Sequence, residues 1–149
     1  MIENLKASFK NNIPSCFSYF RKRKIGILGG SFNPAHSGHI HISNTAKTKL
    51  GLDEIWWLVA PQNRLKSHIG METFQKRLSY ARILTNKFNY IKVLDLEEKN
   101  NLYASYKTVK FLSGKSKAAK FIWLVGSDIL DNFNKWLYPS FITKKMPVA

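Results

Sequence analysis

The sequence predicts an α/β fold built on a doubly wound parallel sheet of about five strands. Apolar runs of strand length alternate along the chain with amphipathic segments of helix length. Such alternation is typical of parallel strands that are joined by right-handed helical crossovers. The apolar runs are nearly continuous, which indicates strands buried on both faces. A glycine-rich turn follows the first run, where a sheet of this kind places a ligand.

The first half of the chain contains three expected strands and two expected helices. The strands are residues 24–29, 54–60 and 90–96, and the helices are residues 38–50 and 72–85. In the first helix, apolar residues recur at i, i+4 and i+8, and Gly51 follows as a terminator. The second helix has one apolar stripe, formed by Phe74, Leu78, Ala81 and Leu84.

The second half continues the alternation. We expect a polar loop at 97–101, a helix at 105–113 with Gly114 just beyond it, and a strand at 121–125. A short helix is expected between this strand and Trp136, and a further short helix around 141–143. Residues 146–149 have the pattern of the first half of a fifth strand. Together, these elements predict a Rossmann-like sheet in a single domain, residues 24–149. Residues 1–23 are expected to be a basic N-terminal extension.

Composition bounds the protein class without deciding its function. The chain has 149 residues, is 44% hydrophobic and has a formal net charge of +15. No apolar run approaches the ~20 residues of a membrane span, and residues 1–23 lack the apolar core of a secretory signal. The lone Cys16 cannot form an internal disulfide, so a cytoplasmic location is expected. The charge fits a nucleic acid, a phosphorylated small molecule or a lysine-rich solvated surface.

The most informative stretch is the segment at 29–39, GGSFNPAHSGH. Its glycines lack the spacing of a dinucleotide-binding G-x-G-x-x-G, and no lysine follows them as a Walker loop requires. Gly29 and Gly30 leave bare backbone against which a nucleotide can lie. The helix that follows offers free N–H groups, a ready phosphate site. His36 and His39 are three apart, so both can face one phosphoryl group, with Gly38 leaving the approach open.

The two histidines have two other interpretations. They could simply cap the helix, with Gly38 as a turn residue. They could also bind zinc together with His41, but residues two apart on a helix point in different directions. Carboxylate or cysteine ligands are missing nearby. A phosphate-binding role is therefore favoured.

The segment at 29–39 resembles the signature of the nucleotidylyltransferase superfamily, in which a strand leads to an H/T-x-G-H helix start. Within it, the sequence is similar to bacterial nicotinate mononucleotide adenylyltransferase. Further stretches agree: WWLVAPQNRLK at 56–66, SYKT at 105–108 and FIWLVGSD at 121–128. The resemblance covers residues 24–149. It implies transfer of AMP from ATP to nicotinate mononucleotide, giving deamido-NAD and pyrophosphate.

The resemblance also implies roles for particular residues. His36 and His39 would be catalytic and would stabilise charge on the α-phosphoryl group. ATP would be bound by Gly29, Gly30, Ser31, Phe32, Gly38, Gly126 and Asp128, and the mononucleotide by Lys66, Ser105 and Trp136. Mg²⁺ would be held through ATP phosphates, with no metal site in the protein. Arg77 matches a family arginine that we interpret as structural.

Alternatives stay open for several of these roles. Asp128 could instead be the N-cap of the helix that follows it. Trp136 could be a partly buried core aromatic, and Lys66 a surface lysine.

The family pattern continues beyond the fifth strand to a serine-threonine-arginine segment that holds ATP phosphates, whereas this sequence ends at KKMPVA. One alternative is therefore a truncated nucleotide-binding remnant of weak or no activity. Another is a different nucleotidylyltransferase, such as a phosphopantetheine adenylyltransferase. The expected partners are ATP and nicotinate mononucleotide, with neither nucleic acid nor a membrane.

Overall fold

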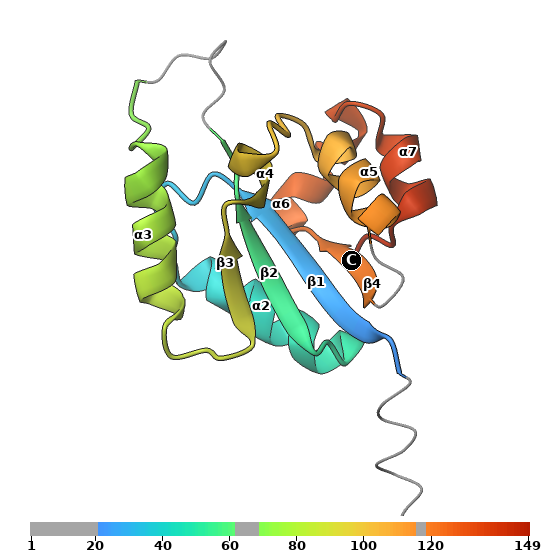
Figure 1. Cartoon of the computed structure of the whole chain (residues 1–149), viewed down its shortest axis with the longest axis horizontal. Helices are drawn as coiled ribbons and strands as arrows, with labels where there is room; N and C mark the ends of the chain where they lie inside the picture. Colours follow the sequence, from blue (N-terminus) through green and yellow to red (C-terminus); the bar gives the residue numbers. More distant parts are fainter. Residues whose placement is uncertain (1–20, 62–68, 116–118) are drawn as a thin grey trace, which may run out of the picture.

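A computed structural model describes residues 21–61, 69–115 and 119–149. Its centre is a parallel sheet in the order β3-β2-β1-β4. The strands are β1 (Arg23–Gly30), β2 (Glu54–Val59), β3 (Ile91–Leu94) and β4 (Ala119–Leu124). All of them end at the upper edge of the sheet in Figure 1. The chain moves outward from β1 through β2 to β3 and then crosses back to β4. The switch point of the fold therefore lies between β1 and β4.

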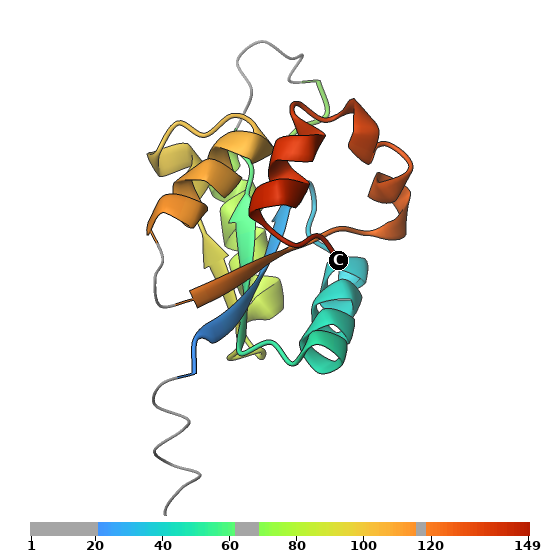
Figure 2. The ribbon, with the colours of Figure 1, turned by 90° about the vertical axis from the view of Figure 1, so that its right-hand side faces the viewer.

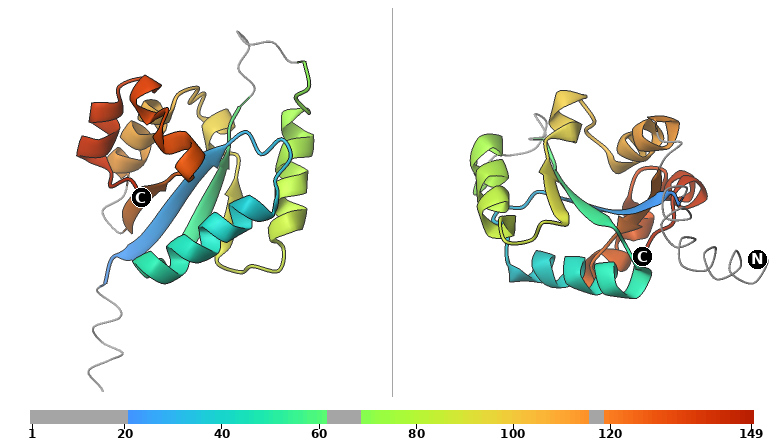
Figure 3. Two further views of the ribbon diagram at one scale, coloured as in Figure 1. Left: turned by 180° about the vertical axis from the view of Figure 1, so that it is seen from behind. Right: turned by 60° about the horizontal axis from the view of Figure 1, so that its bottom comes forward.

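Helices cover both faces of this sheet. They are α2 (Ser37–Leu50), α3 (Phe74–Thr85), α4 (Leu96–Lys99), α5 (Ser105–Lys115), α6 (Ser127–Leu130) and α7 (Pro139–Lys145), with a 3₁₀ helix η1 (Phe133–Lys135). Figures 2 and 3 show α2 and α5 on opposite faces, with α7 beside α5. The predicted doubly wound α/β fold is confirmed.

Two apolar clusters explain why the strands are apolar almost without interruption. On one face, Trp57 and Val59 pack with Leu78 and Ala81 of α3. On the other face, Leu58 packs in the cluster that includes α5 and α7 residues. Because successive strand residues point to opposite faces, both sets must be apolar when both faces are covered.

In place of the fifth strand that the sequence predicts at 146–149, the structure has an isolated β-bridge. Val148 forms a parallel bridge to Trp123. The Trp123 N–H donates to the Pro147 carbonyl at 2.8 Å, and the Ala149 N–H donates to the Trp123 carbonyl at 2.9 Å. In the described residues the sheet thus has four strands rather than about five, and Val148 is bridged to β4.

Local structure differs from the sequence prediction at three places. Residues 97–101 are not simply a polar loop, because α4 forms there and buries Glu97. Gly114 lies inside α5, which continues to Lys115, rather than beyond the helix. The single short helix expected before Trp136 is divided into α6 and η1, whose residues include no buried ones.

The domain boundary predicted at residue 24 stays a prediction, because residues 1–20 lie outside the described residues. β1 itself begins one residue earlier, at Arg23. The Arg21 guanidinium forms an ion pair with Asp53 near the start of β2. No helix in the described part of the chain is long and apolar enough to cross a membrane.

Candidate active site

The segment at 29–39 lies at the carboxyl end of β1 and leads directly into α2. Gly29 and Gly30 are the last residues of β1. The chain then turns at Asn33 and Pro34 and enters α2 at Ser37. The chain leaves β2 and β4 at the same edge of the sheet (Figure 1).

Phe32 anchors this segment in the core. Its side chain is 1% exposed, stacks on Trp57 with ring centroids 4.8 Å apart and lies 4.8 Å from the His39 ring. Its backbone has a φ of +48°, a left-handed conformation that costs a non-glycine residue roughly 1 to 3 kcal/mol. Burial of the ring holds the backbone in that conformation.

His36 and His39 form a reciprocal cap at the start of α2. The Gly38 N–H donates to His36 Nδ1 at 3.1 Å, and the His36 N–H donates to His39 Nδ1 at 3.2 Å. The ring centroids are 3.9 Å apart. The two histidines thus make the pair of bonds that serine and glutamate make in the usual capping box.

This cap determines which ring nitrogen carries the proton. A nitrogen that accepts a hydrogen bond has no proton, so a neutral imidazole in this arrangement is protonated at Nε2. Both Nε2–H groups are then donors that the cap does not use. The capping interpretation of these histidines and the phosphate-binding interpretation are therefore compatible.

The surroundings of His39 favour its neutral form. Burial lowers the pKa of His39, and repulsion from His36 lowers it further. The backbone bond from His36 and the charge of Asp128 act in the opposite direction. The influence of Asp128 also shows that α6 lies within electrostatic range of the histidines.

The turn after β4 approaches α2 closely. Gly126 is the N-cap of α6, and Asp128 lies in the first turn of that helix. The alternative that Asp128 is the N-cap is therefore wrong. A Cβ at Gly126 would collide with the Asp128 carboxylate and lie 3.4 Å from Ile42 Cδ1 of α2. At position 126, a side chain would therefore displace the exposed Asp128 carboxylate and would touch α2.

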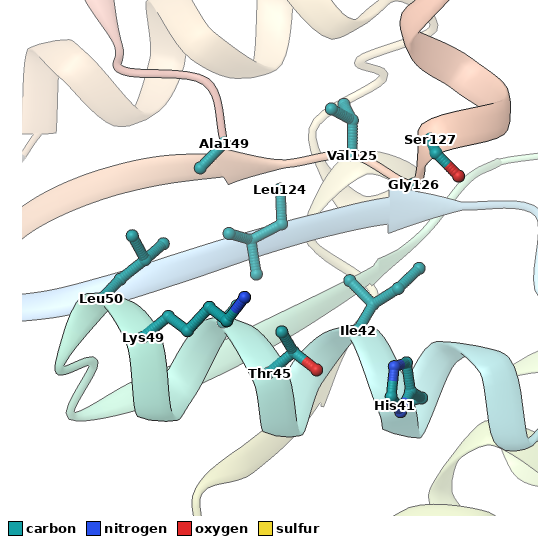
Figure 4. Close-up of a pocket in the computed structure, with 11 residues that line it drawn as sticks. His41, Ile42, Thr45, Lys49, Leu50, Leu124, Val125, Gly126, Ser127 and Ala149 are labelled. Atoms are coloured by element: carbon teal, nitrogen blue, oxygen red, sulfur yellow. The ribbon is translucent and has the colours of Figure 1, made fainter.

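An apolar groove extends from this turn along α2 and β4. Figure 4 shows Leu124 pointing from β4 toward α2, with Ile42 and Thr45 on the opposite wall. The groove has a volume of about 270 Å³ and ends at Ala149. Gly126 and Ser127 of the turn after β4 line one end of it.

The predicted mononucleotide-binding residues are not brought together with the histidines by any described contact. Trp136 is half-buried and packs edge-on against Trp123 with centroids 6.3 Å apart. This packing supports its interpretation as a core aromatic, while its substrate role stays a prediction. Ser105 begins α5 and lines a separate small cavity. Lys66 lies outside the described residues.

That small cavity contains a buried carboxyl group that the sequence did not reveal. Glu97 is 6% exposed, and the Thr108 hydroxyl donates to its Oε1 at 2.7 Å. Burial raises the pKa of Glu97 to about 7. Nothing in the run Glu97-Glu98 distinguishes the buried acid from its exposed neighbour, so only the packing of α4 against the sheet identifies it.

Within the described residues, no group of three or more His, Cys, Asp or Glu side chains is placed to hold a metal ion. The donors that the cap leaves unused at the β1 end include the Nε2–H groups of the two imidazoles. Such donors suit phosphate oxygens rather than a cation.

The model of the cytidylyltransferase-like family matches residues 27–145, most of the chain. The chain belongs to this family. Relatives include two proteins described as "probable nicotinate-nucleotide adenylyltransferase". One is from Parvibaculum lavamentivorans, 40% identical over 126 residues, or 85% of this chain and 62% of the relative. The other is from Methylorubrum extorquens, also 40% identical over 126 residues, or 85% of this chain and 68% of the relative.

A solved structure has the same fold. The nicotinic acid mononucleotide adenylyltransferase of Plasmodium falciparum, solved in complex with NaAD, matches with a TM-score of 0.67 and 20% identity. The match covers 85% of this chain and 73% of that one. At this identity, the likeness shows the fold.

Proposed function

We propose that this cytidylyltransferase-like protein transfers AMP from ATP to nicotinate mononucleotide, giving deamido-NAD and pyrophosphate. The observation that carries the proposal is the pair His36 and His39, whose Nδ1 atoms are used by the cap of α2 while their Nε2–H groups are not. The names of the relatives from Parvibaculum and Methylorubrum support the choice of substrates.

The reaction needs alignment and charge stabilisation more than proton transfer. An oxygen of the mononucleotide phosphate attacks the α-phosphorus of ATP, and pyrophosphate leaves on the opposite side. Because that oxygen is already an anion, the protein has no proton to remove. Its contribution is to hold two polyanions in line and to stabilise the charge that develops between them.

The β1 end of the site supplies the donors for this task. Nε2–H groups of His36 and His39 would donate to oxygens of the α-phosphoryl group. The Ser31 and Phe32 N–H groups and the N-terminus of α2 would contact the neighbouring phosphates. Gly29 and Gly30 would leave the backbone open. Gly38 would leave room for the His36 ring, since a Cβ at Gly38 would lie 2.9 Å from that ring.

The remaining contacts follow the family pattern. Gly126 and Asp128 would face the ATP ribose, which the approach of this turn to α2 supports. Lys66, Ser105 and Trp136 would bind the mononucleotide. Mg²⁺ would arrive with ATP, be held by its phosphate oxygens and neutralise part of their charge.

The test is release of pyrophosphate from ATP and nicotinate mononucleotide by the purified chain. Release above the level of a His39→Ala control is expected with this acceptor. Phosphopantetheine as acceptor, and CTP as donor, should give no release above that control. Release with phosphopantetheine would favour a different transferase. Binding of ATP without any release would favour the nucleotide-binding remnant.

A further inference from the structure

Arg77 of α3 is the most completely buried charged side chain of the described residues, at 1% exposed. Its hydrogen-bond acceptors are all backbone carbonyls. Nη1 donates to Ser31 at 2.6 Å and to Ala60 at 3.0 Å, and Nε donates to Glu72 at 3.1 Å. In the described part of the chain, it forms no salt bridge, and its Nη2 has no hydrogen-bond partner.

These three carbonyls belong to separate segments at the edge of the sheet where the strands end. Ser31 directly follows β1, Ala60 directly follows β2, and Glu72 precedes α3. One guanidinium therefore ties the carboxyl ends of two neighbouring strands to the start of a helix. A lysine could not do the same, because it lacks the planar fork of donors.

The bond to Ser31 also orients the next residue. The Ser31 C=O and the Phe32 N–H belong to one peptide group, and this group is not cis. In a trans peptide, the C=O and the N–H point in opposite directions. Because Arg77 holds the carbonyl on its own side, the Phe32 N–H must point to the other side. A charged donor on the carbonyl also polarises the peptide and strengthens its N–H as a donor.

Two further observations favour orientation over simple stabilisation. Burial lowers the pKa of Arg77, which shows that the guanidinium is held away from water at a cost. The φ of +48° at Phe32 lies in the left-handed region, which a non-glycine residue rarely adopts. Arg77 holds that peptide from one side, while the stacking of Phe32 on Trp57 holds it from the other.

We propose that Arg77 is a positioning residue that aims the Phe32 N–H at the triphosphate, an inference that rests on the proposed function for the location of ATP. Arg77 does not touch the nucleotide. It acts through the Ser31–Phe32 peptide group.

The first measurement uses the unsubstituted chain without ligand. A scalar coupling across the hydrogen bond between Arg77 Nη1 and the Ser31 carbonyl carbon should be detectable by NMR. Absence of this coupling, in spectra where backbone hydrogen bonds of the sheet show theirs, overturns the proposal. This measurement does not depend on catalysis or on the stability of any variant.

The second measurement compares Arg77→Lys with Arg82→Lys, a change at an exposed arginine of the same helix. Arg77→Lys should move the Ser31 carbonyl and Phe32 amide resonances and weaken ATP binding about tenfold or more, the loss expected for one charge-assisted hydrogen bond. Arg82→Lys should leave these resonances and the affinity for ATP unchanged. Unmoved Phe32 resonances in a folded Arg77→Lys chain contradict the proposal.

The third measurement is chemical rescue. Millimolar guanidinium added to Arg77→Ala should restore ATP affinity, whereas the same salt should not change the affinity of the unsubstituted chain. Failure of the unsubstituted chain to bind ATP would defeat the proposed function, while the coupling and the Phe32 resonances would still decide whether Arg77 orients this peptide.

Discussion

The two sides of the switch point are built very differently. The β1 rim, residues 29–39, is held by the His36–His39 cap, by the stacked Phe32 ring and by Arg77. The β4 rim, residues 126–138, consists of α6 and η1, neither of which has a side-chain cap. Leu130, Leu137 and Tyr138 on this rim are more than half exposed, at 57%, 63% and 64%.

The difference matches what each rim is proposed to bind. Phosphoryl transfer requires donors that are already in place when charge develops, and a rigid rim provides them. Ribose and ring contacts tolerate adjustment, and segments with few buried contacts adjust at low cost. The comparison therefore predicts that changes at the β1 rim affect stability and activity strongly, and that equivalent changes at the β4 rim affect them weakly.

The largest expected contrast is between the aromatic residues of the two rims. Phe32→Ala should lower the free energy of unfolding by about 3 to 5 kcal/mol, because a fully buried ring is removed. Trp136→Ala, which removes a half-buried ring, should cost about 1 to 2 kcal/mol. Urea unfolding measures both. Equal losses would mean that the β4 rim is as firmly packed as the β1 rim.

The second-largest effect is expected from the loss of a histidine hydrogen-bond donor. His39→Ala should reduce the turnover rate by about 10² to 10³, or roughly 2.7 to 4 kcal/mol, as for other donors to a developing anion. His39→Asn can still accept from the His36 N–H but lacks the Nε2–H donor. It should therefore keep more stability than His39→Ala and be equally slow in pyrophosphate release. The exposed His41→Ala is the control, and normal turnover by His39→Asn would contradict the donor role.

A pH-dependent effect is expected at Glu97. The pKa of this carboxyl is about 7 in the fold and is taken as 4.5 for the unfolded chain. At a pH between these two pKa values, Glu97 is ionised in the unfolded chain and protonated in the folded chain. Stability contributed by Glu97 is therefore present at acid pH and falls as pH rises through 7, by about 3 kcal/mol at most.

Glu97→Gln cannot ionise, so it should lose less stability than the unsubstituted chain between pH 5 and pH 8. Urea unfolding of the two chains at both pH values measures the difference in their free energies of unfolding. This difference removes pH-dependent contributions that both chains share, such as that of His39. Glu98→Gln, at the exposed neighbouring position, is the matched control. A parallel pH response of the unsubstituted and Glu97→Gln chains would show that Glu97 is solvated.

The smallest effects are expected at two glycines. In Gly38→Ala, the new Cβ displaces the His36 ring. The lost cap costs about 1 kcal/mol, and the gain in helix propensity is of similar size. Stability should thus change little, whereas pyrophosphate release should fall about tenfold. Gly126→Ala needs only a rotation of the exposed Asp128 side chain and should change the rate less. A larger loss at Gly126 would reverse the comparison.

Much of the fold was predictable because it follows from local patterns. Gly51 ends α2 in the left-handed conformation, as its position after the apolar stripe indicates. Residues 97–101 were less predictable, because burial of Glu97 depends on how α4 meets the sheet. The spacing of the histidine pair predicted that both residues lie together at the start of α2. The use of both Nδ1 atoms in the cap was not predictable, since serine and glutamate ordinarily fill those positions.

The sequence by itself determined the order of strands and helices, the family and the location of the glycine- and histidine-containing turn at 29–39. These depend on residue periodicity and on a contiguous motif, both of which are local in the chain. Only the tertiary structure decided that Arg77 holds Ser31 and Ala60, and that Phe32 stacks on Trp57. The physical reason is that a buried guanidinium selects acceptors by proximity in space, and these carbonyls are 46 and 17 residues away along the chain.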